Sequence, residues 1–309
     1  MANQDRVQIN RRVFVVAASA ALFCRARPAR SGELRTVLAT TNVVARLARA
    51  LVPDGVVQLL PTGFDPERFT PRPGDLAVMQ SGDLLLRAGA GFDDWATLLA
   101  RRVQRADLAT ASVDLSRGIA LLEVKGRAVE ASDGHAHGSA NPHWWLDPVN
   151  AKTAVASIAA ALLAADPARE AVLSARLDAF NASLNAGLAR WSAALAPYAN
   201  QPVLAYHNSF PYLARRFRLD IAATVELREG VSPGPARLAE IADIARSKHV
   251  RLLLVEQADP GQLTPALTRA AALTPVALPS NGEAPGETYV AMMDALVARL
   301  ADAFAKVGA

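Results

Sequence analysis

Histidine is scarce in this sequence, and its five copies fall in segments of different kinds. His143 lies in a loop just before Asp147, which can cap a helix that starts at Pro148. His207 follows the apolar run 202–206, so we expect it at the carboxyl end of a strand. His249 lies between a helix and a strand at the opposite end, where we expect it to be exposed. His143 and His207 are therefore the histidines best placed for a binding site.

Two carboxylates, like His207, are expected at or just after the carboxyl end of a strand. Glu67 comes shortly after one predicted strand, and Glu256 ends another, the run 251–256. In open parallel sheets the carboxyl ends of the strands border the ligand crevice. Imidazole and carboxylate without thiolate suit Zn²⁺, Mn²⁺ or Fe²⁺, and the single cysteine, Cys24, lies in the leader. Any one histidine alone is more often a packed or solvated residue, so these positions by themselves support only a weak metal hypothesis.

Apolar runs of strand length alternate with segments of helical periodicity in both halves of the chain. We expect strands over 34–40, 55–62, 83–88, 109–114, 202–206, 220–227, 250–255 and 275–278. We expect helices over 42–51, 74–80, 93–102, 210–217, 235–247, 265–272 and from 287 onward. Such alternation is typical of parallel sheets covered by helices on both faces. The predicted fold class is α/β, with two lobes.

Between the halves, residues 168–196 contain no proline and carry apolar residues three or four positions apart from Leu173 to Leu195. Prolines 167 and 197 bound this stripe, which predicts one helix about 44 Å long. It is either a peripheral helix of one domain or a stiff strut between two lobes. We adopt the second interpretation: an N-terminal lobe at 31–166, a linking helix at 167–197 and a C-terminal lobe at 198–309.

The first 30 residues resemble an export signal. Arg11-Arg12 precede the apolar stretch 15–24, the pattern of a twin-arginine signal, although a general secretory signal with two arginines has the same form. Six arginines and one acid give this segment +5, so the remaining chain carries −1 of the net +4. The body thus offers no general electrostatic case for nucleic acid. No apolar run reaches the roughly 18 residues of a membrane span, so we expect none in the mature chain.

Several motifs, in chain order, resemble the zinc/manganese-binding receptors of bacterial ABC importers. The clearest are Asn141-Pro-His-Trp-Trp-Leu-Asp-Pro148 and Tyr206-His-Asn-Ser-Phe-Pro-Tyr212. Also matched are Asp65-Pro-Glu-Arg-Phe69, Gly89-Ala-Gly-Phe-Asp-Asp-Trp95, Val255-Glu-Gln257 and Tyr289-Val-Ala-Met-Met293. The resemblance covers about 35–305. It implies two α/β lobes joined by one long helix, with a single metal ion between them.

The resemblance also implies a ligand set. His143 and His207 match two of the family's metal-binding histidines, and Glu256 matches its strand-end glutamate. Glu67 stands where the family usually has a third histidine. A glutamate there makes the site harder and more anionic, which favours Mn²⁺ or Fe²⁺, although Zn²⁺ accepts two histidines and a glutamate readily. The alternative is that Glu67 marks a weakened or altered site.

His135 and His137 fall where many zinc-binding relatives carry a histidine-rich loop. Two histidines make a poor version of that loop. They either form an auxiliary site that passes metal to the cleft or belong to a solvated loop.

We therefore expect a periplasmic, monomeric receptor without catalytic activity, which delivers a divalent metal to a membrane permease powered by a separate ATPase. The main rival is a secreted zinc hydrolase, because two histidines and one glutamate with an open position also form a catalytic zinc set. Against it, the sequence has no His-Glu-x-x-His helix, and Glu256 is the only candidate for the base. A third reading is an adhesin or structural protein with a relic site.

Overall fold

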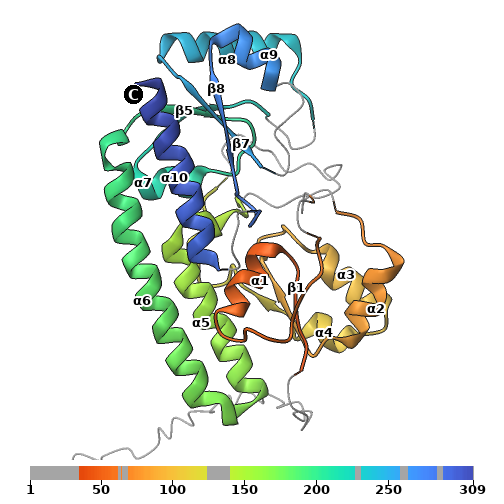
Figure 1. The fold of residues 1–309 in the computed structure, drawn as a ribbon. Coiled ribbons are helices and arrows are strands. Elements are labelled where there is room, and N and C mark those ends of the chain that lie inside the picture. The colour runs from red at the N-terminus through yellow and green to blue at the C-terminus, as the bar shows by residue number, and fades with distance from the viewer. Residues whose placement is uncertain are drawn as a thin grey trace, which may run out of the picture. The chain divides into compact units, whose positions relative to one another are not determined.

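The computed structural model of the 309-residue chain describes residues 35–61, 64, 69–123, 140–226, 231–257, 264–283 and 288–308. These residues form two parallel sheets with helices around them, as the sequence predicts (Figure 1).

The first sheet has strand order β2-β1-β3-β4, and all of its pairs are parallel. Its strands are β1 (Val37–Ala39), β2 (Val56–Gln58), β3 (Leu84–Arg87) and β4 (Val113–Asp114). Its helices are α1 (Asn42–Arg49), α2 (Pro73–Ser81), α3 (Trp95–Arg102) and α4 (Ala106–Thr110). Leu38 and Leu85 face one apolar cluster while their neighbours Val37 and Leu84 face another, because successive strand side chains point to opposite faces. The sheet is thus covered on both faces.

The second sheet repeats this arrangement with the order β6-β5-β7-β8, again entirely parallel. Its strands are β5 (Pro202–Ala205), β6 (Asp220–Thr224), β7 (Leu252–Glu256) and β8 (Thr274–Leu278). Its helices are α7 (Pro211–Phe217), α8 (Pro235–Ser247) and α9 (Thr264–Ala271). In each sheet the first strand of the half lies between the second and the third. The crevice where ligands bind in such sheets is therefore expected beside the carboxyl ends of β1 and β3, and of β5 and β7.

Three long helices complete the structure: α5 (Pro148–Ala165) and α6 (Glu170–Leu195), which lie between the two sheets in the chain, and α10 (Tyr289–Val307), which follows the second sheet. Helix α6 is the predicted continuous helix, and it contacts both α5 and α10 (Figure 1). Its stripe, including Leu173, Leu184 and Leu195, is buried in one apolar core that also takes in residues of both sheets. The helix therefore belongs to a shared core as well as joining the two halves.

By length and composition alone, α5 could cross a membrane, and it is the one such helix among the described residues. It buries Ala151, Val155, Ile158 and Leu162 against the core and contacts α1 and α6. This one-sided burial is the pattern of a core helix in a globular unit.

The predicted strand over 109–114 is wrong in its first half. Residues Ala106–Thr110 form the short helix α4, and only Val113–Asp114 pair with β3. The side chain of Arg105 donates hydrogen bonds to the carbonyl oxygens of Gln80 and Gly82 and to the Asp107 carboxylate. These tertiary contacts fix the start of a helix too short to show a periodic pattern.

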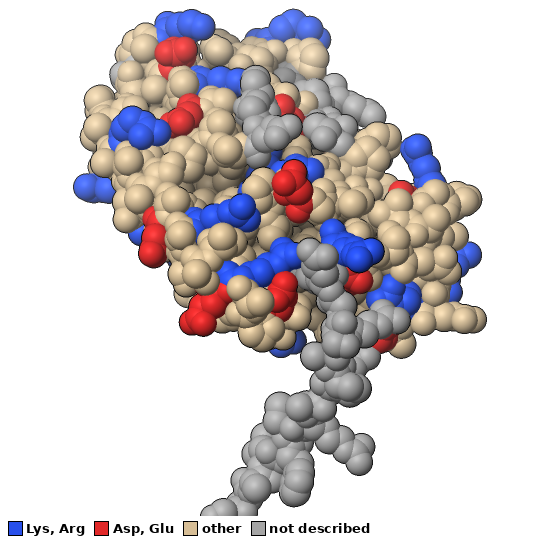
Figure 2. Space-filling view, turned by 60° about the horizontal axis from the view of Figure 1, so that its bottom comes forward, with Lys and Arg blue, Asp and Glu red and all other residues tan. Residues whose placement is uncertain are grey.

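Charges of both signs are interspersed on the face shown in Figure 2. Several of the arginines are paired with acids, as Arg190 is with Asp294.

Candidate metal centre

His143 lies in the segment before the 3-10 turn Trp144–Leu146, and it is 7% exposed. Its ring lies between two aromatic side chains, with ring centroids 5.4 Å from Phe92 and 5.3 Å from Trp145. The side-chain oxygen of Asn141 accepts the His143 backbone N–H at 3.0 Å and lies 3.3 Å from Nδ1 of the same residue. The imidazole is therefore held from two sides.

Asp147 anchors the segment that carries His143. As the sequence predicts, it caps helix α5, and its side chain accepts the backbone N–H of Val149. The same buried carboxylate receives two hydrogen bonds from Arg216, at 2.6 and 2.8 Å. Because Arg216 belongs to α7, which follows the His207 segment in the chain, this ion pair ties the two predicted ligand segments to each other.

His207 lies two residues after the end of β5, and its Nδ1 lies 3.0 Å from Oε2 of Glu226. Both side chains are largely buried, with 12% and 8% of their surface exposed. Glu226 comes just after β6, and its backbone N–H donates to the carbonyl oxygen of Tyr206. A carboxylate on one ring nitrogen fixes the orientation of an imidazole, which leaves Nε2 as the nitrogen suited to a metal.

Asn141 joins the two histidine segments directly. Its Nδ2 donates to the carbonyl oxygen of Asn208 at 2.6 Å, next to His207, while its oxygen holds His143. The hydroxyl of Tyr212 donates to the backbone oxygen of Asn141 at 2.8 Å. Burial raises the pKa of Tyr212 above its usual value, so the phenol stays protonated and able to donate.

Glu256 ends β7, the strand beside β5, and is 8% exposed. The hydroxyl of Ser280 lies 3.4 Å from its Oε1. The backbone oxygen of Ser280 accepts the indole N–H of Trp145 at 2.7 Å. Glu256 is thereby connected, through Ser280 and Trp145, to the aromatic rings that hold His143.

The turn after β8 contains Ser280 and Asn281. The nearby Glu283 accepts the backbone N–H of Asn281 at 3.0 Å. Burial raises the pKa of Glu283 above its usual value. This carboxylate therefore stabilises the turn of its own segment.

Asp93 organises the loop after β3. Its carboxylate accepts the backbone N–H groups of Ala88 and Gly89 at 2.6 and 3.0 Å and the Thr40 hydroxyl at 2.5 Å. Burial raises its pKa from 3.8 to about 6, although these hydrogen bonds and a nearby arginine oppose the shift. The loop that Asp93 holds carries Phe92, which packs on the His143 ring.

Glycine is required at position 89 of this loop. The backbone φ of Gly89 is +79°, and a Cβ atom there would lie 1.7 Å from a carboxylate oxygen of Asp114. Next to it, the carbonyl oxygen of Ala88 accepts the indole N–H of Trp144 at 2.9 Å. The close approach of Asp114 in β4 therefore explains why this loop has a glycine at position 89.

The structure brings three of the four predicted ligands to one connected region: His143, His207 and Glu256. Glu67, His135 and His137 lie outside the described residues. Within the described part of the chain, no three side chains of His, Cys, Asp or Glu are grouped to hold one ion. The four-residue ligand set therefore remains a prediction. His249, in contrast, is exposed at the other end of the second sheet, as expected.

Two residues of this region were not predicted as site residues. Glu226 follows β6, which neighbours β5, the strand that precedes His207, so the strand-end rule applied to Glu67 and Glu256 could have indicated it. Asn141 belongs to a motif noted in the sequence, but nothing in the motif reveals its bond to Asn208.

A family model described as the periplasmic component A of zinc-uptake complexes matches residues 37–303. The high-affinity zinc uptake system protein ZnuA of Paracoccus denitrificans is 28% identical over 259 residues, which cover 73% of this chain and 76% of that protein. ZnuA of Brucella abortus is 31% identical over 110 residues, a match that spans only 33% of the relative and 36% of this chain.

The fold is similar to that of the substrate-binding protein FpvC of Pseudomonas aeruginosa, solved in complex with Mn²⁺. The TM-score is 0.77 at 24% identity, and the match covers 89% of this chain and 100% of that one. The same protein has also been solved with Ni²⁺. At this identity the likeness establishes the two-lobe fold.

Proposed function

This chain belongs to the family of the periplasmic component A of zinc-uptake complexes, and we propose that it is a periplasmic receptor for a divalent transition metal. It binds the ion between its two lobes and delivers it to an ABC permease driven by a separate ATPase. No chemical turnover is involved. The resemblance found in the motifs and the two-lobe α/β fold are both confirmed by these comparisons.

The observation that carries the proposal is the direct link between the two histidine segments. Asn141 contacts His143 and donates to the backbone next to His207, so both imidazoles belong to one hydrogen-bonded unit. Buried imidazoles oriented by an amide and a carboxylate are the ligands that transition metals prefer in proteins.

The proposed ligands are His143, His207 and Glu67, with Glu256 supporting the site or acting as a fourth ligand. Two histidines and carboxylates accept Zn²⁺, Mn²⁺ and Fe²⁺. Relatives named as zinc-uptake proteins and a neighbour solved with Mn²⁺ support Zn²⁺ and Mn²⁺ among these metals. We expect Zn²⁺ to bind most tightly, because affinity of nitrogen and oxygen sites for Zn²⁺ generally exceeds that for Mn²⁺ and Fe²⁺.

The test combines elemental analysis of protein purified from the periplasm with calorimetric titration of Zn²⁺ and Mn²⁺. Removal of a metal-bonding imidazole should lower affinity most, in His143→Ala and in His207→Ala. The effect should be clear in Glu67→Ala and milder in Glu256→Gln, about 10–100-fold if that residue acts through its neighbours.

His249→Ala is the matched control, because this histidine is exposed at the opposite end of the sheet. Replacing His135 and His137 together by alanine should leave the tight site intact. The proposed site is refuted if His143→Ala and His207→Ala bind both metals as tightly as the parent. Delivery is tested separately, by metal uptake in cells that lack the protein and are complemented with each variant.

A further inference from the structure

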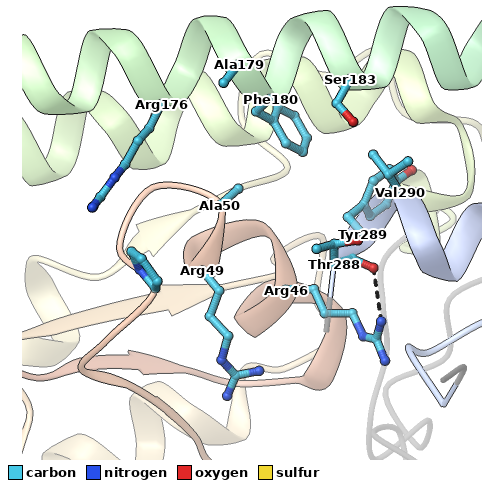
Figure 3. Close-up of a pocket in the computed structure, with 11 residues that line it drawn as sticks. Arg46, Arg49, Ala50, Arg176, Ala179, Phe180, Ser183, Thr288, Tyr289 and Val290 are labelled. Atoms are coloured by element: carbon cyan, nitrogen blue, oxygen red, sulfur yellow. Dashed lines mark hydrogen bonds between the residues drawn. The ribbon is translucent and has the colours of Figure 1, made fainter. Parts of the chain in front are cut away.

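A cavity lies away from His143 and His207, where α1, α6 and the start of α10 meet (Figure 3). Its volume is about 380 Å³, which is within the usual range for small-molecule sites. We infer that this cavity binds a small organic anion, with a carboxylate or phosphate head group and a compact apolar body. This inference does not depend on the proposed metal site.

The apolar part of the cavity comes from all three helices and the turn after α1. Phe180 and Ala179 of α6 face Ala50 across the cavity, and Val290 of α10 extends the apolar wall (Figure 3). Pro53 also lines the cavity. Burying an apolar ligand body against this wall removes apolar surface from water, which favours binding.

Three arginines line the same cavity: Arg46 and Arg49 on α1 and Arg176 on α6 (Figure 3). None of the described residues that line it is acidic. Guanidinium groups next to an apolar wall favour a ligand that combines a planar or tetrahedral anion with an apolar body.

Two of these arginines are held in place by backbone carbonyl groups. Arg46 is only 5% exposed, and it donates to the carbonyl oxygens of Thr288 at 3.0 Å and Gly282 at 2.7 Å. Arg176 donates to the carbonyl oxygen of Leu51 at 2.7 Å. The neutral acceptor of Arg176 positions its charge without neutralising it, and Arg176 has further N–H groups to donate to a ligand. Arg46 also interacts electrostatically with Glu283, so Arg49 and Arg176 are the cationic groups that the inference relies on.

The experiment titrates the full chain with benzoate, octanoate and phenyl phosphate, and with benzamide and octanamide as neutral counterparts. We expect at least one of the anions to bind and the neutral amides to bind at least about tenfold more weakly, because hydrogen bonds to charged groups contribute more than neutral ones. Comparing the carboxylates with phenyl phosphate identifies the preferred head group. Inorganic phosphate tests whether the apolar body matters.

Three variants locate the binding. Arg49→Gln and Arg176→Gln should each weaken the anion at least about tenfold. Ala179→Trp should fill the cavity and abolish binding, and none of these changes touches the predicted metal ligands. Matched controls are Arg101→Gln on α3 and Ala189→Trp on the exposed side of α6, which should bind like the parent.

The inference is overturned by any one of three results. The first is that no anion binds at a concentration of about 10 mM, which is high enough to detect weak ligands. The second is that the neutral amides or inorganic phosphate bind as tightly as the organic anions. The third is that Arg49→Gln, Arg176→Gln and Ala179→Trp all bind the anion with the affinity of the parent. Thermal melting of each variant shows whether it is folded. If all variants of the cavity are unfolded, competition between the probes in the parent still decides the ligand class.

Discussion

The buried carboxylate of Asp93 should make the stability of the fold depend on pH in a measurable way. Burial raises its pKa to about 6, whereas an aspartate in the unfolded chain titrates near 3.9, as a rough reference value. The folded state binds the Asp93 proton more tightly than the unfolded state does. The stability that this proton contributes to the fold is therefore fully present below about pH 4 and is lost as the pH rises through about 6. A shift of about two pKa units corresponds to about 3 kcal/mol.

The substitution Asp93→Asn removes this titration and keeps the shape of the side chain. The amide nitrogen cannot accept a hydrogen bond, whereas both oxygens of even a protonated carboxyl group can, so the variant loses one of the bonds from the backbone N–H groups of Ala88 and Gly89. The variant should therefore be less stable than the parent at pH 4, and the difference in unfolding free energy should narrow by about 3 kcal/mol between pH 4 and pH 7.5.

Urea unfolding at a series of pH values, followed by tryptophan fluorescence, measures this difference. Trp144 is a suitable reporter because its indole N–H bonds to the carbonyl oxygen of Ala88 in the same loop. Asp94→Asn is the control, because the Asp94 side chain is 66% exposed. If the stability difference between Asp93→Asn and the parent does not change with pH, the reasoning about the buried carboxylate is refuted.

Three further predictions concern the helix, the site and the leader. Leu184→Pro should lower the free energy of unfolding by about 3 kcal/mol or more, and with it the melting temperature, because it removes a backbone hydrogen bond in the middle of α6. The control Leu184→Met should change stability little. Equal melting temperatures for Leu184→Pro and the parent would contradict a packed, continuous helix. Glu226→Gln should weaken metal binding about 10–100-fold in calorimetry through its contact with His207, and unchanged affinity would show that the carboxylate does not orient the ring. Replacing Arg11 and Arg12 by lysine should leave the protein in the cytoplasm of fractionated cells, and normal export would indicate a general secretory signal instead.

The elements that the sequence predicted well are those whose patterns are long or fully apolar. Helix α8 has the predicted bounds, Pro235–Ser247, and the stripe of α6 runs through one unbroken helix. Strand β7 (Leu252–Glu256) is buried along its whole length, so its apolar run was unambiguous. Helix α4 (Ala106–Thr110) was missed because five residues show no period and tertiary contacts decide their conformation.

The site was predictable as a set of positions but not as a set of contacts. His207 and Glu256 could be placed because adjacent parallel strands end at the same edge. The contact between His207 and Glu226 could not, because the register of β5 against β6 shifts between Val203 and Leu204. Counting residues along the two strands therefore misplaces whatever follows β6. The link through Asn141 depends on side-chain rotamers, which a sequence pattern does not specify.

The position of α10 has a consequence for how the chain folds during synthesis. Its buried face, with Met292, Leu296, Leu300 and Phe304, belongs to the same core as Val37 at the other end of the described chain. Contacts this distant in sequence form only after the whole chain is available, and they make folding slow. A chain that ends before Tyr289 would leave the cluster shared by both sheets open to water, so we expect such a fragment to aggregate or be degraded. Neither sheet is therefore expected to fold as an independent unit, and the last helix completes both.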